Sequence, residues 1–140
     1  MGAGSRSPKL TRAGRQAVAA AVAAAEGFTG LQICVYLGRA GADSRARAEE
    51  LFVSSGLTAR PGVMVLVAPR EHRVEVVTAP AVRERIPDDA AAAAVDAMTT
   101  RFAAGDLAAG IVAGVRHLAA AAGPGAPDAD AGDLPDLLDG

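Results

Sequence analysis

Five large apolar side chains in succession, at residues 63–67, constrain this fold most strongly. They lie within Gly62–Ala68, a segment with no polar side chain. Such a run is typical of a central β-strand covered on both faces, because neither face of it can be left in water. It needs a strand at its side and helices above and below it. The run therefore predicts a layered α/β domain.

Two further segments are predicted to be strands. Residues 31–37 alternate large aliphatic residues with other types, which predicts a strand with one apolar face. Arg73–Thr78 alternates charged and apolar residues, which predicts a strand more exposed on one side. Only a turn at residues 69–72 separates it from the central strand, so these two form an antiparallel hairpin. The first strand reaches the central one through a helix, in a right-handed parallel crossover.

Capping residues and helical periodicity predict the helices between and after these strands. The first is expected over residues 11–26, the second over residues 43–55, and a short one over residues 81–86. The expected helix caps are Thr11, Asp43, Asp88 and Asp106, and the expected helix ends are Gly27, Gly56 and Gly105. Helices on both sides of the strands give an α/β fold, a three-layer α/β/α sandwich around a small mixed sheet.

Charge divides the chain into three parts, although its net charge is only −2. Residues 1–16 contain four basic residues and no acidic one, and residues 123–140 contain five aspartates and no basic one. We expect a disordered basic N-terminus over residues 1–8, a folded domain over residues 9–122, and a disordered acidic tail rich in Gly, Pro and Asp over residues 123–140. Alternatively, Leu134, Leu137 and Leu138 make the end of the tail a short docking peptide.

Several classes of protein do not fit this sequence. It has no transmembrane run and no secretory signal, so a cytoplasmic location is expected, with at most peripheral contact between the basic N-terminus and an anionic membrane. A single cysteine, Cys34, excludes a disulfide framework, and we expect a buried structural thiol. His117 is expected at the surface or partly buried, and the two histidines have no zinc spacing. Few aromatic residues and balanced charges in the folded part argue against nucleic-acid binding.

One candidate site lies beyond the carboxyl ends of the two parallel strands, where α/β folds usually bind ligands. The amino end of the second helix offers free N–H groups there, which favour a small anion, and His72 is a candidate proton carrier. The alternative is an exposed charged turn beside an ordinary helix cap. The residues expected at this anion site are Arg39, Asp43, Ser44, Arg70, Glu71, His72 and Arg73.

A second candidate site lies at the opposite rim of the sheet. Two or three carboxylates with backbone carbonyls there suit calcium or magnesium, which would polarise a phosphate and activate water. The alternative is that Asp88 and Asp106 only cap helices. The candidate cleft consists of Thr78, Asp88, Asp89 and Asp106, with Thr29 and Gly62 beside it; the metal ligands would be Asp88, Asp89 and Asp106.

The order of elements resembles a known family. The segments GLQICVYLG, AEELF, GVMVLVAP and RVEVVTA, followed by IPDD and MTTRF-AAGDLAAGIVAGVRHLA, resemble the TPM domain, and more closely a TPM-like group of unknown function from high-GC bacteria. The resemblance covers about residues 9–122. It implies a Rossmann-like fold and points to the rim at Asp88. Some relatives are associated with acid phosphatase activity and photosystem repair, others with accessory domains of membrane proteins. Two family features are absent here, an acidic residue before Gly62 and a glycine at position 79.

Two functions follow from these observations. The absence of a tight catalytic constellation favours a non-enzymatic binding or accessory module, with a protein partner or a small anion as ligand. The resemblance favours a metal-dependent, acid-phosphatase-like hydrolase of phosphate esters as the alternative.

Overall fold

The structure is a computed structural model that describes residues 9–125 and 137–139 of the chain. Its sheet has the order β3-β2-β1-β4. The strands are β1 (Gln32–Leu37), β2 (Gly62–Ala68), β3 (Arg73–Thr78) and β4 (Leu137–Asp139). β1 and β2 are parallel, and β3 returns antiparallel to β2. The predicted strands, their neighbours and their directions are confirmed.

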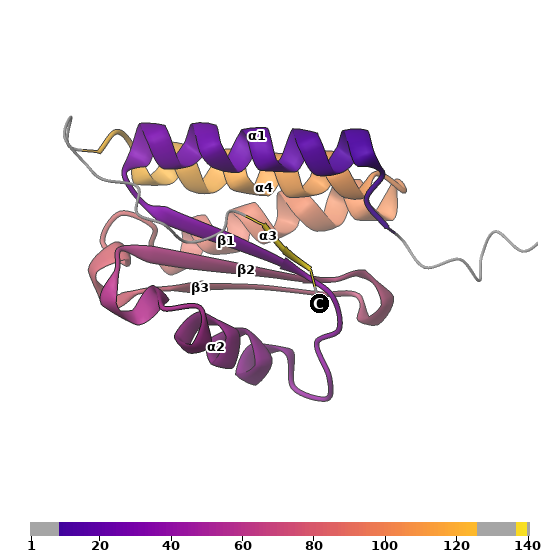
Figure 1. Cartoon of the computed structure of the whole chain (residues 1–140), viewed down its shortest axis with the longest axis horizontal. Helices are drawn as coiled ribbons and strands as arrows, with labels where there is room; N and C mark the ends of the chain where they lie inside the picture. The colour runs from indigo at the N-terminus through magenta and orange to yellow at the C-terminus, as the bar shows by residue number, and fades with distance from the viewer. Residues whose placement is uncertain (1–8, 126–136, 140) are drawn as a thin grey trace, which may run out of the picture.

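The helices form layers on both faces of the sheet. They are α1 (Arg12–Thr29), α2 (Ser44–Ser54), α3 (Asp88–Ala103) and α4 (Leu107–Ala122). Figure 1 shows α1, α3 and α4 together on one face and α2 on the other. This arrangement confirms the three-layer sandwich. β2 is buried along its whole length, as expected for a strand covered on both sides.

The end of the first helix and the short helix after the third strand differ from the prediction. α1 does not end at Gly27 but continues to Thr29, and Gly30 takes the left-handed conformation with φ 75°. Thr29 explains the shift, because its hydroxyl donates to the Ala25 carbonyl at 2.7 Å and accepts from the Leu31 N–H at 3.1 Å. The expected helix over residues 81–86 is only the 3₁₀ turn Pro80–Val82.

Three of the four predicted N-caps are confirmed, since Thr11, Asp43 and Asp106 each accept a hydrogen bond from a backbone N–H three residues ahead. The prediction for Asp88 is wrong, because Pro87 occupies the cap position and Asp88 is the first helical residue. Proline fits this boundary because it favours the extended backbone that precedes a helix. Asp88 and Asp89 lie in the first turn of α3. Their negative charges interact favourably with the positive end of the helix dipole there.

The core is aliphatic and lies on both sides of β1 and β2. Cys34 is fully buried in it, and His117 is exposed, as predicted for both. α4 packs closely on α3 through Gly110 and Gly114, which face Phe102 and Met98. Among the described residues, no helix is both long and apolar enough to cross a membrane.

The chain beyond α4 differs from the expected disordered tail at residues 137–139, which form β4 alongside β1. Residues 123–125 are also placed, and Gly125 donates from its N–H to the Phe28 carbonyl at 2.8 Å. The expected N-terminal segment 1–8 and the remainder of the tail lie outside the described residues. The membrane contact proposed for that N-terminus therefore stays a prediction.

Candidate functional site

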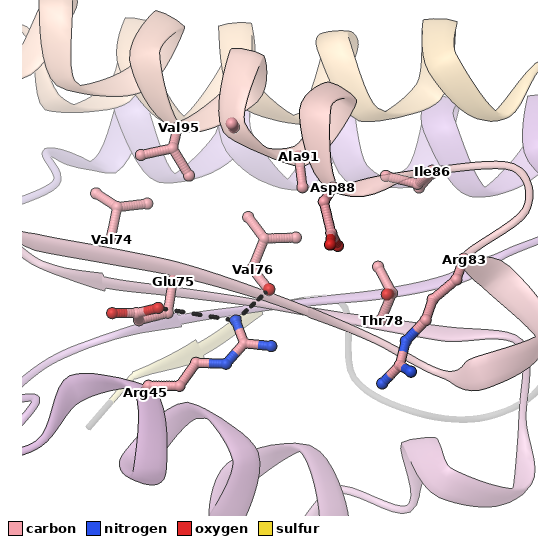
Figure 2. Close-up of a pocket in the computed structure, with 11 residues that line it drawn as sticks. Arg45, Val74, Glu75, Val76, Thr78, Arg83, Ile86, Asp88, Ala91 and Val95 are labelled. Atoms are coloured by element: carbon pink, nitrogen blue, oxygen red, sulfur yellow. Dashed lines mark hydrogen bonds and ion pairs between the residues drawn. The ribbon is translucent and has the colours of Figure 1, made fainter.

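A groove of about 530 Å³ follows the outer edge of β3, with α3 above it and α2 below it (Figure 2). β3 is the last strand at this end of the sheet, so the groove runs beside an edge that no other strand of the described residues covers. Its lining consists of Arg45, Val74, Glu75, Val76, Thr78, Arg83, Ile86, Asp88, Ala91, Ala92 and Val95. The groove therefore combines aliphatic walls with charged side chains.

The backbone of β3 presents hydrogen-bonding groups to this groove. The Ala79 N–H donates to the Gly62 carbonyl at 2.9 Å. The odd-numbered residues of β3 are therefore the ones whose backbone groups bond to β2. Because bonded and non-bonded pairs alternate in an antiparallel ladder, the N–H and C=O groups of Val74, Val76 and Thr78 face outward. Arg45 donates from Nη1 to the Val76 carbonyl at 2.7 Å. The outward groups of Val74 and Thr78 have no hydrogen-bond partner among the described residues.

A network of charged side chains lies on the α2 side of the groove, below β3 (Figure 2). Arg45 contacts the Glu49 carboxylate at 3.1 Å and the Glu75 carboxylate at 3.7 Å, in addition to Val76. The Ser44 hydroxyl donates to the second oxygen of Glu75 at 2.6 Å. This network fixes α2 against β3. The pairing of Arg45 with Glu49 is predicted by their four-residue spacing, whereas the reach to β3 has no signal in the local sequence.

One end of the groove, its open end, carries Arg83, Thr78 and Asp88. Figure 2 shows the Asp88 side chain pointing down from α3 toward β3, and Arg83 lying beyond Thr78. Arg83 and Asp88 are exposed, and Arg83 forms no ion pair with any residue of the described ranges. An unpaired guanidinium with five N–H donors is suited to a carboxylate or another planar anion. This end of the groove is therefore a place where an anionic group can be held.

The predicted cleft is only partly assembled. Thr78 and Asp88 line the same groove, whereas Asp89 lies outside its lining and accepts from the Ala90 N–H at 3.0 Å. Asp106 caps α4 at the far end of α3. The 16 residues of α3 separate the two ends by about 24 Å at 1.5 Å per residue. Thr29 is buried in the turn after α1. Across the described residues, no group of three or more His, Cys, Asp or Glu side chains is placed to hold a metal ion.

In the predicted anion site, one of the expected members, Glu71, bonds to the loop that precedes α2. Glu71 Oε2 accepts from the Ala40 and Gly41 N–H groups, each at 3.1 Å. Asp43 and Ser44 are also engaged, with the Ala46 N–H and with Glu75. The remaining members of the set are exposed: Arg39, Arg70, His72 and Arg73. These contacts support the interpretation as a charged turn beside an ordinary helix cap.

The comparison with protein families gives one match that spans most of the chain. The model of a domain of unknown function, DUF5130, matches residues 2–119. Uncharacterised proteins from two strains of Mycobacterium tuberculosis are 34% identical over 95 residues. That alignment covers 68% of this chain and 56% of each relative, so the chain spans little more than half the length of these relatives.

Two solved structures resemble the fold. The NMR structure of the BA42 protein from Bizionia argentinensis has a TM-score of 0.83 at 22% identity, covering 94% of this chain and 95% of that chain. The solution structure of the N-terminal domain of a protein from P. gingivalis has a TM-score of 0.68 at 19% identity, covering 80% and 75%. At these identities the likeness concerns the fold alone.

Proposed function

We propose a binding function for this chain, which belongs to the DUF5130 family of domains of unknown function. The groove along β3 binds an extended peptide segment of a partner protein. The peptide adds a strand to the sheet, and its acidic side chain pairs with Arg83. The observation that carries this proposal is the outward backbone edge of Val74, Val76 and Thr78 inside a groove with aliphatic walls.

Strand addition is a common way for a sheet edge to recognise a peptide. Main-chain hydrogen bonds supply affinity, and pockets for alternate side chains supply specificity. Natural sheets usually protect their edges with charged residues or covering loops. Here Arg45 covers the Val76 carbonyl, and the neighbouring groups of Val74 and Thr78 have no partner in the part of the chain that the structure describes. A peptide N–H takes the place of the Arg45 guanidinium on Val76, while Glu49 and Glu75 hold the displaced side chain.

The walls of the groove select the side chains of the peptide. Val74 and Val76 on β3 and Val95 on α3 together form an aliphatic surface (Figure 2). This surface favours β-branched residues at alternate peptide positions. Arg83, at the open end, favours an aspartate or glutamate. Asp88 nearby disfavours a second acidic residue on the same side. The preferred ligand is thus an alternating aliphatic peptide with one carboxylate.

The test is the selection of linear peptides from a display library on the immobilised full-length chain. We expect enrichment of alternating β-branched residues with one acidic residue. Ala92→Trp places an indole in the groove and is expected to weaken the selected peptides at least about tenfold, the loss of roughly 1.4 kcal/mol. Binding is measured by fluorescence polarisation.

Ala93→Trp is the matched control, because Ala93 is an exposed neighbour on α3 outside the groove lining. It should bind the selected peptides like the unmodified chain. Arg83→Glu should reverse the preference for acidic peptides, whereas Arg101→Glu, in the last turn of α3 and outside the groove, should not. Equal binding to the Ala92→Trp and Ala93→Trp variants would contradict the proposal.

The resemblance to TPM domains supports a second candidate, a metal-dependent hydrolase of phosphate esters. Thr78, Asp88 and Arg83 share the open end of the groove and would contact a phosphate there. A calcium ion takes six to eight oxygen ligands, and the described residues do not gather such a donor set. Assay of the chain with p-nitrophenyl phosphate, with and without magnesium or calcium, separates the two functions. The binding module predicts no turnover above buffer, and metal-dependent turnover that Asp88→Asn abolishes would favour the hydrolase.

A further inference from the structure

The other edge of the sheet is occupied by the C-terminal segment of the chain itself. β4 lies along the outer side of β1 in parallel, pairing Val35, Tyr36 and Leu37 with residues 137, 138 and 139. Figure 1 shows this short yellow strand beside β1, and the strand order places it at the opposite edge of the sheet from β3. This contact does not involve the groove proposed above.

The hydrogen bonds of β1 determine which of its groups face the tail. The Gln32 and Gly38 N–H groups donate to the carbonyls of Pro61 and Val67, so the even-numbered residues of β1 face β2. The odd-numbered residues face outward, as shown by the Ile33 N–H, which donates to Glu26 Oε2 at 2.9 Å. Because the directions alternate along a strand, Val35 and Leu37 present their N–H and C=O groups to the tail.

Glu26 limits where a strand can pair with this edge. Its carboxylate is buried, and it accepts from both the Ile33 N–H and the Gln32 side-chain amide at 2.8–2.9 Å. The first outward N–H of β1 is therefore satisfied by a side chain of α1. An added strand finds matching groups only from Val35 onward, which is where β4 begins to pair.

The tail leaves the domain from a fixed point near this edge. Arg85 donates to the carbonyls of Thr29, Ala122 and Gly123 at 2.9–3.1 Å, which joins the end of α4 to the end of α1. Gly125 then bonds to Phe28, and a side chain there would meet the Thr29 backbone. The departure point is thus at the start of β1, and residue 137 is reached by a chain that can span up to about 40 Å. This geometry suits parallel pairing.

We propose that the outer edge of β1 at residues 35–37 is an exchangeable strand-docking site, whose occupant is the C-terminal segment of this chain. In cis the segment covers the edge and prevents edge-to-edge association. When the cis segment cannot pair, the same segment from another copy takes its place. Tethering gives the cis segment an effective concentration in the millimolar range, so it prevails over a free segment at lower concentration.

The register supplies a matched pair of variants. Opposite Tyr36, the backbone of Leu138 faces the Val35 carbonyl and the Leu37 N–H, because β1 directs these groups outward. The N–H of Leu137, one residue earlier, faces away from β1. Proline has no N–H, so Leu138→Pro removes a group needed for pairing, and Leu137→Pro does not.

The test measures amide hydrogen exchange by NMR in the full-length chain. We expect exchange of the Leu37 amide to be about tenfold faster in Leu138→Pro, the effect of losing one or two backbone hydrogen bonds, and unchanged in Leu137→Pro. The Tyr36 and Gly38 amides face β2 and serve as internal controls that should not change. Equal Leu37 exchange in the unmodified chain and in Leu138→Pro would overturn the docking of the segment.

Exchangeability is tested by adding a synthetic peptide of residues 131–140 at millimolar concentration. It should slow Leu37 exchange in Leu138→Pro back toward the unmodified value, and leave the unmodified chain unaffected. The same peptide carrying the Leu138→Pro change is the control and should have no effect. Failure of the unmodified peptide to slow Leu37 exchange in the Leu138→Pro chain would overturn exchange in trans.

Discussion

Replacing Glu26 with alanine is expected to lower the free energy of unfolding by about 3 kcal/mol, because it leaves two buried donors without their acceptor at about 1–3 kcal/mol each. These donors are the Ile33 N–H and the Gln32 side-chain amide. Glu26 is 6% exposed and Gln32 is 3% exposed, so water does not readily replace the carboxylate. Urea denaturation followed by circular dichroism measures the change.

Two control variants distinguish the loss of the hydrogen-bond acceptor from the loss of the charge and from the shortening of the side chain. Glu26→Gln keeps one carbonyl oxygen and should lose only about 1 kcal/mol, the net value of a hydrogen bond. Glu49→Ala removes an exposed carboxylate of α2 and should stay within about 0.5 kcal/mol of the unmodified chain. If Glu26→Ala were as stable as Glu49→Ala, the buried carboxylate would not hold the start of β1.

The second large effect is expected at Gly114, where α4 crosses α3. A Cβ there would lie 2.5 Å from the Cγ and Sδ atoms of Met98, a residue with no exposed surface into which it can move. Gly114→Leu should overpack this contact by about 3 kcal/mol, offset by about 1 kcal/mol from better helix propensity. The expected net loss is about 2 kcal/mol, which thermal unfolding reports as a shift of roughly 10 °C.

Ala120→Leu is the control for this substitution, because Ala120 is exposed on the same helix. It places the same side chain in α4 without the contact to Met98 and should change the stability by less than about 0.5 kcal/mol. Met98→Ala combined with Gly114→Leu should recover part of the loss, since it makes room for the new side chain. A Gly114→Leu variant as stable as the unmodified chain would show that the helices do not approach this closely.

The three predicted strands followed from side-chain patterns that are local and strong. The apolar run of β2 and the alternation in β3 depend only on which faces are buried, and the short turn between them leaves a hairpin as the simple connection. Three helix caps were predictable for the same reason, since a capping side chain bonds within three residues of itself.

The boundaries that were missed depend on competition between neighbouring residues. Gly27 and Gly30 are both suitable helix ends, and the choice is made by Thr29, whose hydroxyl bonds back to Ala25 and forward to Leu31. At α3, Pro87 takes the cap position ahead of Asp88 because its backbone is already extended. The helix-end and helix-cap preferences of single residues do not decide which of two neighbouring positions is used.

The candidate site was only half predictable, because its members come together through tertiary contacts. Thr78 and Asp88 were expected on one rim and do share the groove, but Asp106 is separated from them by the length of α3. Arg45 reaches Val76 from a different layer of the fold, and Glu71, which was expected to line the anion site, accepts from the Ala40 N–H instead. Neither contact could be predicted from the spacing of these residues in the sequence.

The most direct test of the binding function is an NMR titration of the full-length chain with a peptide selected on it. Strand addition predicts new protection from exchange for the amides of Val74, Val76 and Thr78, whose N–H groups face outward. The amides of Glu75 and Val77 already bond to β2 and should not change. Protection confined to β3 in this alternating pattern would support the account. Saturable binding without it, or with changes centred on the loop at Glu71, would contradict it.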